Sequence, residues 1–415
     1  MRYKDVPEFG VLYGVKVVCA AMSQAGPYAA ELMAEMGADV TWIENPDNMD
    51  VVRMRLGMTG ESERRNMRNL CMRIPTDEGK ATLLKMLTTA DIFIESSKGL
   101  QYEKYGLSDD VLWQANPRLV IVHISGYGKY GVKEYVDRPS YDPVAQAFSG
   151  IMDLQGFPDK PPIQAQVSML DYYTALHAST AALAALRKAE KTGVGDSIDV
   201  AQYEIGFRCS ANKVPEYFTL GEFTPKVGNH NPNYAAWGTY VCTDGAAVML
   251  IILGVPSVKR ICSLLGLEYP SELFPAGKGN IPINSEGAKV IEAALREYCD
   301  THTASEMELE FSNMRIPCCR VMNYEDIKAN AQYAARETII QWDAAPGSRY
   351  EGTKITGAAP VPRFKRNPQQ IWRGCPYIGC DNEDVLLDYG LTEEQISELR
   401  EKDVIVVPNP DIDYF

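Results

Sequence analysis

The chain has 415 residues, more than one hydrophobic core usually organises, so two domains are expected. Apolar residues make up 46% and charged residues 23% of the chain, the balance of a globular protein. The net charge of −14 argues against a broad surface for nucleic acid or anionic membranes. An anionic ligand would need a local cluster of Lys and Arg inside this acidic chain.

Membrane, secretory and metal-binding classes are not expected either. The longest apolar run, residues 246–255, is too short to span a bilayer, and residues 1–8 lack the apolar core of a secretory signal. The ten cysteines form no CxxC pair, and the chain has only four histidines, so we expect no metal site. These features predict a cytoplasmic protein with reduced cysteines.

Short apolar runs alternate with helical patterns in the N-terminal half. The predicted strands are residues 14–20, 40–44, 91–95 and 119–124, and the predicted helices are residues 26–39 and 77–88. The first helix has Pro27 near its start and Gly37 near its end, the usual asymmetry. Alternation of this kind is typical of βαβ units, so we expect an α/β fold with a parallel sheet.

Ligands bind parallel sheets at the carboxyl ends of the strands. Three loops follow predicted strands here: residues 22–27, 96–99 and 125–131. None carries the glycine fingerprint of a dinucleotide-binding or P-loop protein. Lys98 and Lys129 lie in two of these loops, and each is either a ligand contact or a solvated surface lysine.

The second half of the chain changes character near residue 215. A helix near 175–189, a strand at 197–201 and a helix at 202–212 precede the change, and a hairpin over 239–253 and an amphipathic helix over 392–402 follow it. We therefore expect a large domain beginning with residues 1–215, a small α+β domain over 225–325, and a return segment over 330–415 that completes the large domain.

Asp171 stands before a stretch of small residues, 172–186, that predicts a helix. Asp is a good N-cap, and the helix dipole would keep its carboxylate ionised at neutral pH. A positioned carboxylate is also what acyl transfer through a mixed anhydride requires. The residue is therefore either an ordinary cap or a nucleophile.

A family resemblance enters through several motifs taken together. They occupy residues 24–27, 37–40, 43–46, 90–95, 116–120, 141–150 and 192–200. In their order and spacing the chain resembles the class III (family III) CoA-transferases, which include formyl-CoA, crotonobetainyl-CoA:carnitine and bile-acid CoA-transferases.

The resemblance implies a chemistry and an architecture. Asp171 matches the family's nucleophile, which carries CoA between an acyl-CoA and a small free carboxylic acid through an aspartyl anhydride and an aspartyl-CoA thioester. No metal or cofactor beyond CoA is implied. The implied fold is a Rossmann-like large domain, with a parallel sheet built from both termini, plus a smaller α+β domain. The implied assembly is an interlocked homodimer without nucleic-acid or membrane partners.

The resemblance also implies binding residues. Those expected to contact CoA are Gln24, Lys98, Lys104 and Arg138. Lys104 stands near a position where the family has a phosphate-contacting Arg, and Tyr141 matches a tyrosine close to the nucleophile. The implied contacts therefore fall around the predicted loops and the region before Asp171.

The acid substrate is open to two interpretations. The aromatic residues Tyr234, Trp237 and Tyr240 favour a quaternary ammonium acid such as carnitine, γ-butyrobetaine or crotonobetaine, because aromatic faces bind such groups. In the second interpretation these three residues belong to the core of the small domain. A bile acid is the alternative substrate.

A different reaction must also be considered. Racemases of 2-methylacyl-CoA thioesters share the fold and use an Asp–His pair. His123 and His177 are the candidate partners, although His177 would not share a helical face with Asp171.

Overall fold

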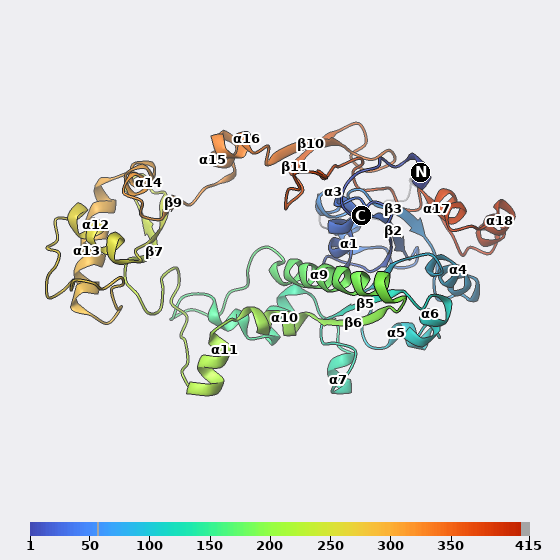
Figure 1. The fold of residues 1–415 in the computed structure, drawn as a ribbon, viewed down its shortest axis with the longest axis horizontal. Helices are drawn as coiled ribbons and strands as arrows, with labels where there is room; N and C mark the ends of the chain where they lie inside the picture. Colours follow the sequence, from blue (N-terminus) through green and yellow to red (C-terminus); the bar gives the residue numbers. More distant parts are fainter. Residues whose placement is uncertain (56–57, 408–415) are drawn as a thin grey trace. The chain divides into compact units, whose positions relative to one another are not determined.

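The computed structural model describes residues 1–55 and 58–407. The chain folds into two compact units, shown in Figure 1. The first unit takes Met1–Ile151, Ala165–Ala211 and the chain from Arg336 onward, and the second takes Met152–Gln164 and Asn212–Ala335. The sequence analysis had assigned residues 152–164 to the large domain, whereas they pack with the second unit.

A six-stranded parallel sheet lies at the centre of the first unit, in the order β3-β2-β1-β4-β5-β6. Its strands are β1 Lys16–Ala20, β2 Asp39–Glu44, β3 Arg68–Cys71, β4 Ile92–Glu95, β5 Val120–Ser125 and β6 Asp196–Ala201. This is a Rossmann-type order, in which the chain direction across the sheet reverses between β1 and β4. The parallel α/β fold predicted from the alternating pattern is confirmed.

Strand β3 is the one strand of this sheet that the sequence pattern missed. Two of its four residues, Arg68 and Asn69, are polar, yet both are buried. The Arg68 guanidinium lies 2.8 Å from Asp39 and 2.6 Å from Asp388, and Asn69 donates to Glu44 at 2.6 Å. Because these partners come from distant segments, local hydrophobicity could not reveal the strand.

Helices cover both faces of the sheet. Along β1, Val17 and Cys19 point to a core shared with α1 (Ala25–Glu35) and α9 (Met169–Thr192), while Val18 points to the opposite core. That second core includes residues of α4 (Asp77–Leu87) and α6 (Asp109–Ala115). The small residues of α9, such as Ala178 and Ala182, let it pack closely on α1 and the sheet.

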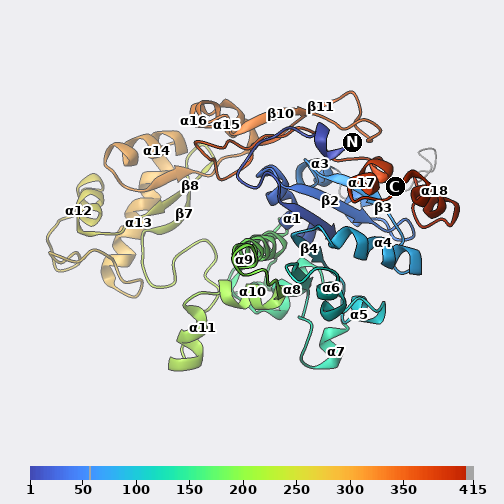
Figure 2. The ribbon, with the colours of Figure 1, turned by 45° about the vertical axis from the view of Figure 1, so that its right-hand side comes forward.

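The C-terminal segment completes the second core without extending the sheet. Within residues 336–407 it adds the hairpin β10 (Ile339–Asp343) and β11 (Lys354–Ala358) and the helices α17 (Asn382–Asp388) and α18 (Glu393–Glu401), but no strand of the parallel sheet. Helix α17 contacts β3, and α18 packs on α17; both helices are red in Figure 2. The expectation that both termini build the sheet is therefore wrong for the strands, although both termini build the unit.

The second unit has its own core. An antiparallel sheet of β7 (Trp237–Val241), β8 (Ala247–Ile251) and β9 (Cys318–Arg320) packs with α12 (Val255–Leu264), α13 (Glu286–Thr301) and α14 (Ala304–Asn313). The predicted hairpin over 239–253 is the pair β7–β8. The core centres on aliphatic residues such as Val248 and Ile291, with Phe311 fully buried.

Three general features of the described residues bear on function. None of their helices is long and apolar enough to cross a membrane, and none of their His, Cys, Asp and Glu side chains cluster in a way that could hold a metal ion. The ten cysteines are free thiols.

Candidate active site

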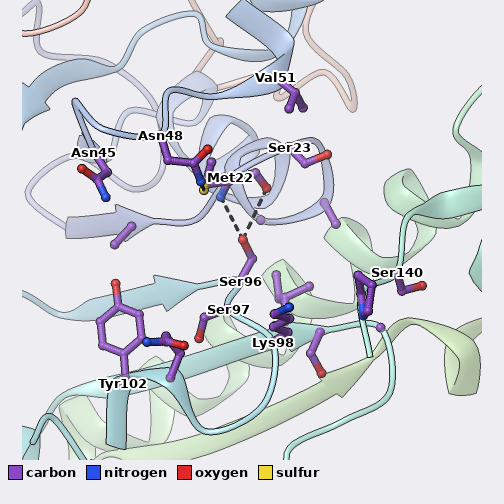
Figure 3. Close-up of a pocket in the computed structure, with 18 of the residues that line it drawn as sticks. Met22, Ser23, Asn45, Asn48, Val51, Ser96, Ser97, Lys98, Tyr102 and Ser140 are labelled. Carbon is purple, nitrogen blue, oxygen red and sulfur yellow. Dashed lines mark hydrogen bonds between the residues drawn. The ribbon is translucent and has the colours of Figure 1, made fainter. Parts of the chain in front are cut away.

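A cavity of about 470 Å³ opens at the carboxyl edge of the parallel sheet. Its walls include residues that end or follow β1 and β4, the two neighbouring strands between which the strand order reverses. Met22 and Ser23 follow β1, Asn45 follows β2, and Ser96, Ser97 and Lys98 follow β4, as Figure 3 shows. Parallel sheets bind ligands at this place because the loops on either side of the reversal diverge.

The loops after β1 and β4 are joined by one side chain. The Ser96 hydroxyl accepts a hydrogen bond from the Met22 N–H at 2.8 Å and donates to the Met22 carbonyl at 3.3 Å, drawn as dashed lines in Figure 3. Gly26 lies in the first turn of α1, directly after this loop, and a Cβ there would lie 2.4 Å from the Cβ of Ala21. Glycine is therefore needed for the tight entry into α1.

A buried charge cluster supports the loop that carries Lys98. Glu95, fully buried at the end of β4, accepts the Ser97 N–H at 2.6 Å and lies 2.6 Å from both Lys129 Nζ and His123 Nδ1. Lys129 also donates to the Gly99 carbonyl at 3.1 Å. Lys129 is thus a structural residue of this loop rather than a solvated lysine.

His123 is held between two carboxylates. Its Nδ1 lies 2.6 Å from Glu95 and its Nε2 2.9 Å from Asp109. Burial would lower the pKa of His123, but the bonds to Asp109 and Glu95 raise it to about 9, so the ring is cationic at neutral pH. Neither His123 nor the exposed His177 is among the residues that line the cavity with Asp171, so the described cavity contains no Asp–His pair of the racemase kind.

Asp171 lines the cavity from the first turn of α9 but does not cap that helix. Helix α9 begins at Met169, and its N-cap Ser168 makes no side-chain cap bond. Instead Asp142, at the start of α8 (Asp142–Phe148), accepts the N–H groups of Leu170 at 2.6 Å and Asp171 at 3.1 Å. The predicted N-cap role of Asp171 is therefore wrong, because its carboxylate does not accept hydrogen bonds from the first N–H groups of α9.

Asp171 is buried, with 8% of the residue exposed. Gln202, at the start of α10 (Gln202–Cys209), donates its side-chain amide to Oδ1 of Asp171 at 2.6 Å. Burial raises the pKa of Asp171 to about 7; the carboxylates of Asp142 and Glu63 add to the rise, and the Gln202 bond opposes it. The sequence analysis expected the helix start to keep this group ionised at neutral pH; burial instead brings its pKa up to the neutral range.

A second buried carboxylate lies behind the loop after β1. Glu63 accepts hydrogen bonds from the Tyr172 hydroxyl and, at 3.3 Å, from the Gln24 amide. Arg64, fully buried, donates to the Ser23 carbonyl and lies 3.1 Å from Asp50. The Glu63–Arg64 pair thus supports the loop that forms one cavity wall.

The structure brings four of the predicted site residues to one cavity: Lys98, Arg138, Tyr141 and Asp171. Lys98 and Arg138 are exposed, so they offer positive charge to a solvent-accessible ligand. Gln24 and Lys104 do not line it. The Gln24 side chain bonds Glu63, and Lys104 is exposed at the end of α5 (Gln101–Lys104), whose residues Gln101 and Tyr102 do line the cavity.

The three aromatic residues of the substrate hypothesis belong to the second unit. The rings of Tyr234 and Trp237 are half-buried and stack on each other with centroids 6.5 Å apart. Tyr240 is buried and donates its hydroxyl to Glu292 at 2.9 Å, so it is a core residue of this unit. Tyr234 and Trp237 remain predicted substrate contacts, and Tyr240 no longer supports the hypothesis.

The sequence analysis missed Asp142, Gln202 and Glu63 as members of the site. Asp142 carried a signal, since it precedes Pro143 at a helix start. Gln202 also carried one, because it directly follows the carboxyl end of the predicted strand 197–201. Glu63 carried none, because its pairing with Tyr172 crosses more than one hundred positions of sequence.

A family model and solved structures of other proteins both match most of this chain. Residues 12–382 match the family model described as CoA-transferase family III. A crystal structure of a CaiB/BaiF family protein from Brucella suis superposes with a TM-score of 0.78 at 26% identity, covering 92% of this chain and 100% of that chain. The structure of Rv3272 from M. tuberculosis shares the fold with a TM-score of 0.78 at 20% identity, covering 91% and 99% of the two chains. The chain belongs to CoA-transferase family III, whose members are enzymes that use coenzyme A as a co-substrate without a further cofactor.

Proposed function

We propose that this enzyme transfers CoA from an acyl-CoA thioester to a free carboxylic acid, with Asp171 as the nucleophile. The observation that carries the proposal is the hydrogen bonding of the two Asp171 carboxylate oxygens in the cavity wall. Gln202 bonds its Oδ1, and no hydrogen bond among the described residues engages Oδ2. One oxygen is therefore oriented and the other is available to attack.

The proposed reaction conserves one activated acyl bond throughout. Oδ2 of Asp171 attacks the thioester carbonyl, and the C–S bond then breaks. This step expels CoA as a thiolate and forms a mixed anhydride between Asp171 and the acyl group. The thiolate attacks Cγ of Asp171, releasing the first acid as a carboxylate and leaving an aspartyl-CoA thioester. The second acid attacks this thioester to form a new anhydride, and the thiolate then attacks its acyl carbon. The products are the new acyl-CoA and the Asp171 carboxylate.

The cavity supports this chemistry through position and charge. An anhydride is lost to hydrolysis unless water is kept away, and Asp171 is nearly buried. A carboxylate with a raised pKa is more basic, and so more nucleophilic, than an exposed one once it is ionised. Lys98 and Arg138 in the cavity walls would bind the CoA phosphates, within a chain whose net charge is −14.

The first prediction concerns Asp171. Asp171→Asn, at nearly unchanged volume, and Asp171→Ala should lower transfer more than about 10³-fold while CoA thioester binding persists, because the nucleophile is removed. In the unmodified enzyme, kcat/KM should fall as pH drops below about 7, since protonation removes the nucleophilic carboxylate. Intact-protein mass after mixing with an acyl-CoA should show CoA attached to the enzyme. Substantial transfer by the Ala variant would sink the proposal.

The second prediction concerns CoA binding. Lys98→Ala and Arg138→Ala should each weaken binding by about 1–3 kcal/mol, because a charge-assisted bond to a phosphate is lost. The rise in KM for the thioester, and a weaker dependence of KM on salt, measure the effect. Lys188→Ala is the matched control, since this exposed lysine pairs with Asp196 at the opposite end of β6. The KM of Lys104→Ala for the thioester tests whether CoA contacts α5, the helix that ends at Lys104. A wild-type KM in both the Lys98 and Arg138 variants would contradict this assignment.

For the acid, we propose a quaternary ammonium carboxylate such as carnitine, γ-butyrobetaine or crotonobetaine. The support is the half-buried pair Tyr234 and Trp237, since aromatic faces attract such cations. A bile acid is the alternative within the same reaction.

The third prediction separates these acids. Tyr234→Leu or Trp237→Leu should weaken a betaine acid by about 0.5–2 kcal/mol and leave KM for CoA unchanged. Tyr324→Leu, which removes a ring that is 87% exposed in the same unit, is the control. An analogue with tert-butyl in place of trimethylammonium should be a poorer substrate. Equal use of the analogue, or preference for a bile acid, would replace the betaine hypothesis with the bile-acid one.

We also propose that the enzyme is a homodimer of interlocked chains and acts in the cytoplasm. The chain leaves the first unit and returns to it, as threading requires. Helices α8, α9 and α10 pack together and expose Phe148, Leu176 and Phe207 at 44%, 49% and 43%, respectively. Exposed apolar side chains on packed helices are typical of an association surface. Free cysteines are consistent with a reducing compartment.

The fourth prediction tests the assembly. Light scattering should give twice the 46.1 kDa of one chain. Leu176→Glu should shift the mass toward one chain, because it places a charge within the apolar surface. Leu309→Glu, at a side chain 65% exposed in the second unit, should leave the mass unchanged. A single-chain mass for the unmodified protein at micromolar concentration would refute the dimer.

A further inference from the structure

The side chain of Gln202 lies in the cavity wall next to the Asp171 carboxylate. Gln202 directly follows the last residue of β6, is only 5% exposed, and lines the cavity beside Asp171. Its side-chain nitrogen lies 2.6 Å from Oδ1 of Asp171. The sheet therefore fixes the amide through β6, while the nucleophile is fixed through α9.

We propose that the Gln202 side-chain amide is the oxyanion donor for the carbonyl of Asp171 itself, the group that is attacked when CoA is loaded onto the enzyme and unloaded from it. The inference rests on the proposed function and assigns a catalytic role within it.

The reaction sequence places a negative charge on Oδ1 twice. When the CoA thiolate attacks Cγ of the anhydride, the Cγ–Oδ1 double bond opens and Oδ1 becomes an oxyanion. The bond reforms as the Cγ–Oδ2 bond breaks and the first acid leaves. When the second acid attacks the aspartyl-CoA thioester, Oδ1 carries the charge again until the thiolate leaves. One fixed donor on Oδ1 therefore serves both steps.

The neighbouring helix cannot supply this donor. A helix start usually offers free N–H groups to an anion. Here the Leu170 and Asp171 N–H groups are occupied by Asp142, and the Tyr172 N–H bonds the Ser168 carbonyl at 3.2 Å. Among the described residues, Gln202 alone donates a hydrogen bond to the Asp171 carboxylate.

The surrounding charges make the donor more important. Asp142 and Glu63 both oppose negative charge on Asp171, and they come from different segments of the first unit. An oxyanion on Oδ1 would face the same two carboxylates. A preorganised donor in a nearly buried site counters this repulsion without reorganising during the reaction.

The test uses Gln202→Met, which keeps the length of the side chain and removes the donor. After rapid mixing of the full enzyme with an acyl-CoA, quenched samples are weighed by intact-protein mass to follow aspartyl-CoA formation. The rate should fall about 100-fold, within the range seen on removal of one oxyanion donor. Affinity for the thioester should stay within about threefold of wild type, and the acidic limb of the pH profile should move to higher pH.

Gln202→Glu provides a second variant, since an ionised carboxylate of equal length cannot donate. Its loss should match or exceed that of Gln202→Met. Gln146→Met is the matched control. This fully buried glutamine donates to Asp142 and accepts the Ala165 N–H, but it makes no bond to Asp171. The rate of the Gln146 variant should therefore fall less, and its pH profile should move less, than in the Gln202 variants.

The outcomes separate this inference from the proposed function. A Gln202→Met variant that binds thioester and forms the adduct at the wild-type rate overturns the oxyanion role. Equal losses in the Gln202 and Gln146 variants, with unchanged pH profiles, also overturn it in favour of a packing role. If the unmodified enzyme forms no aspartyl-CoA and Asp171→Ala stays active, the proposed function fails instead.

Discussion

The start of α9 needs an acceptor for its free N–H groups, and in this fold Asp142 supplies it from another helix. The site depends on Asp142, rather than Asp171, being the acceptor for these N–H groups. Had Asp171 capped its own helix, its oxygens would have been occupied by backbone donors and stabilised as an anion. Because Asp142 takes that role, Asp171 keeps its oxygens for the cavity and meets a nearby negative charge. Burial first, and the nearby carboxylates second, raise the pKa of this group to about 7.

Burial of charge recurs throughout the first unit. Three arginines of one short segment, Arg64, Arg65 and Arg68, are each buried and each paired with two carboxylates. Such pairs gain little net stability over apolar packing, but breaking one leaves an uncompensated charge, so they favour a single arrangement. Here that arrangement serves the site and the fold together. Arg64 supports the wall after β1, and Arg68 joins β3 to α17 through Asp388.

These pairs explain how the C-terminal segment belongs to the unit without entering the sheet. The edge strand β3 receives side-chain acceptors and backbone contacts from the return segment. The carboxylate of Asp381 accepts the Asn69 N–H at 2.9 Å, and Asn382 accepts the Cys71 N–H at 2.8 Å. An exposed strand edge is open to association with other chains, and here it is covered by helix-borne polar groups. The N-terminal amine joins the same cluster, since it lies 2.6 Å from Asp381.

The sequence by itself determined the parallel α/β fold, because β1, β2, β4, β5 and β6 are apolar or alternating segments set between helices. Strand direction alone pointed to the carboxyl-edge loops, and the predicted helix start together with the family resemblance pointed to Asp171. The sequence could not determine β3, whose burial depends on ion pairs with Asp39 and Asp388. Nor could it assign the cap of α9 or the ionisation of Asp171. Those depend on Asp142 and Glu63, and on how much water reaches the carboxylate, and only the packing of distant segments decides that.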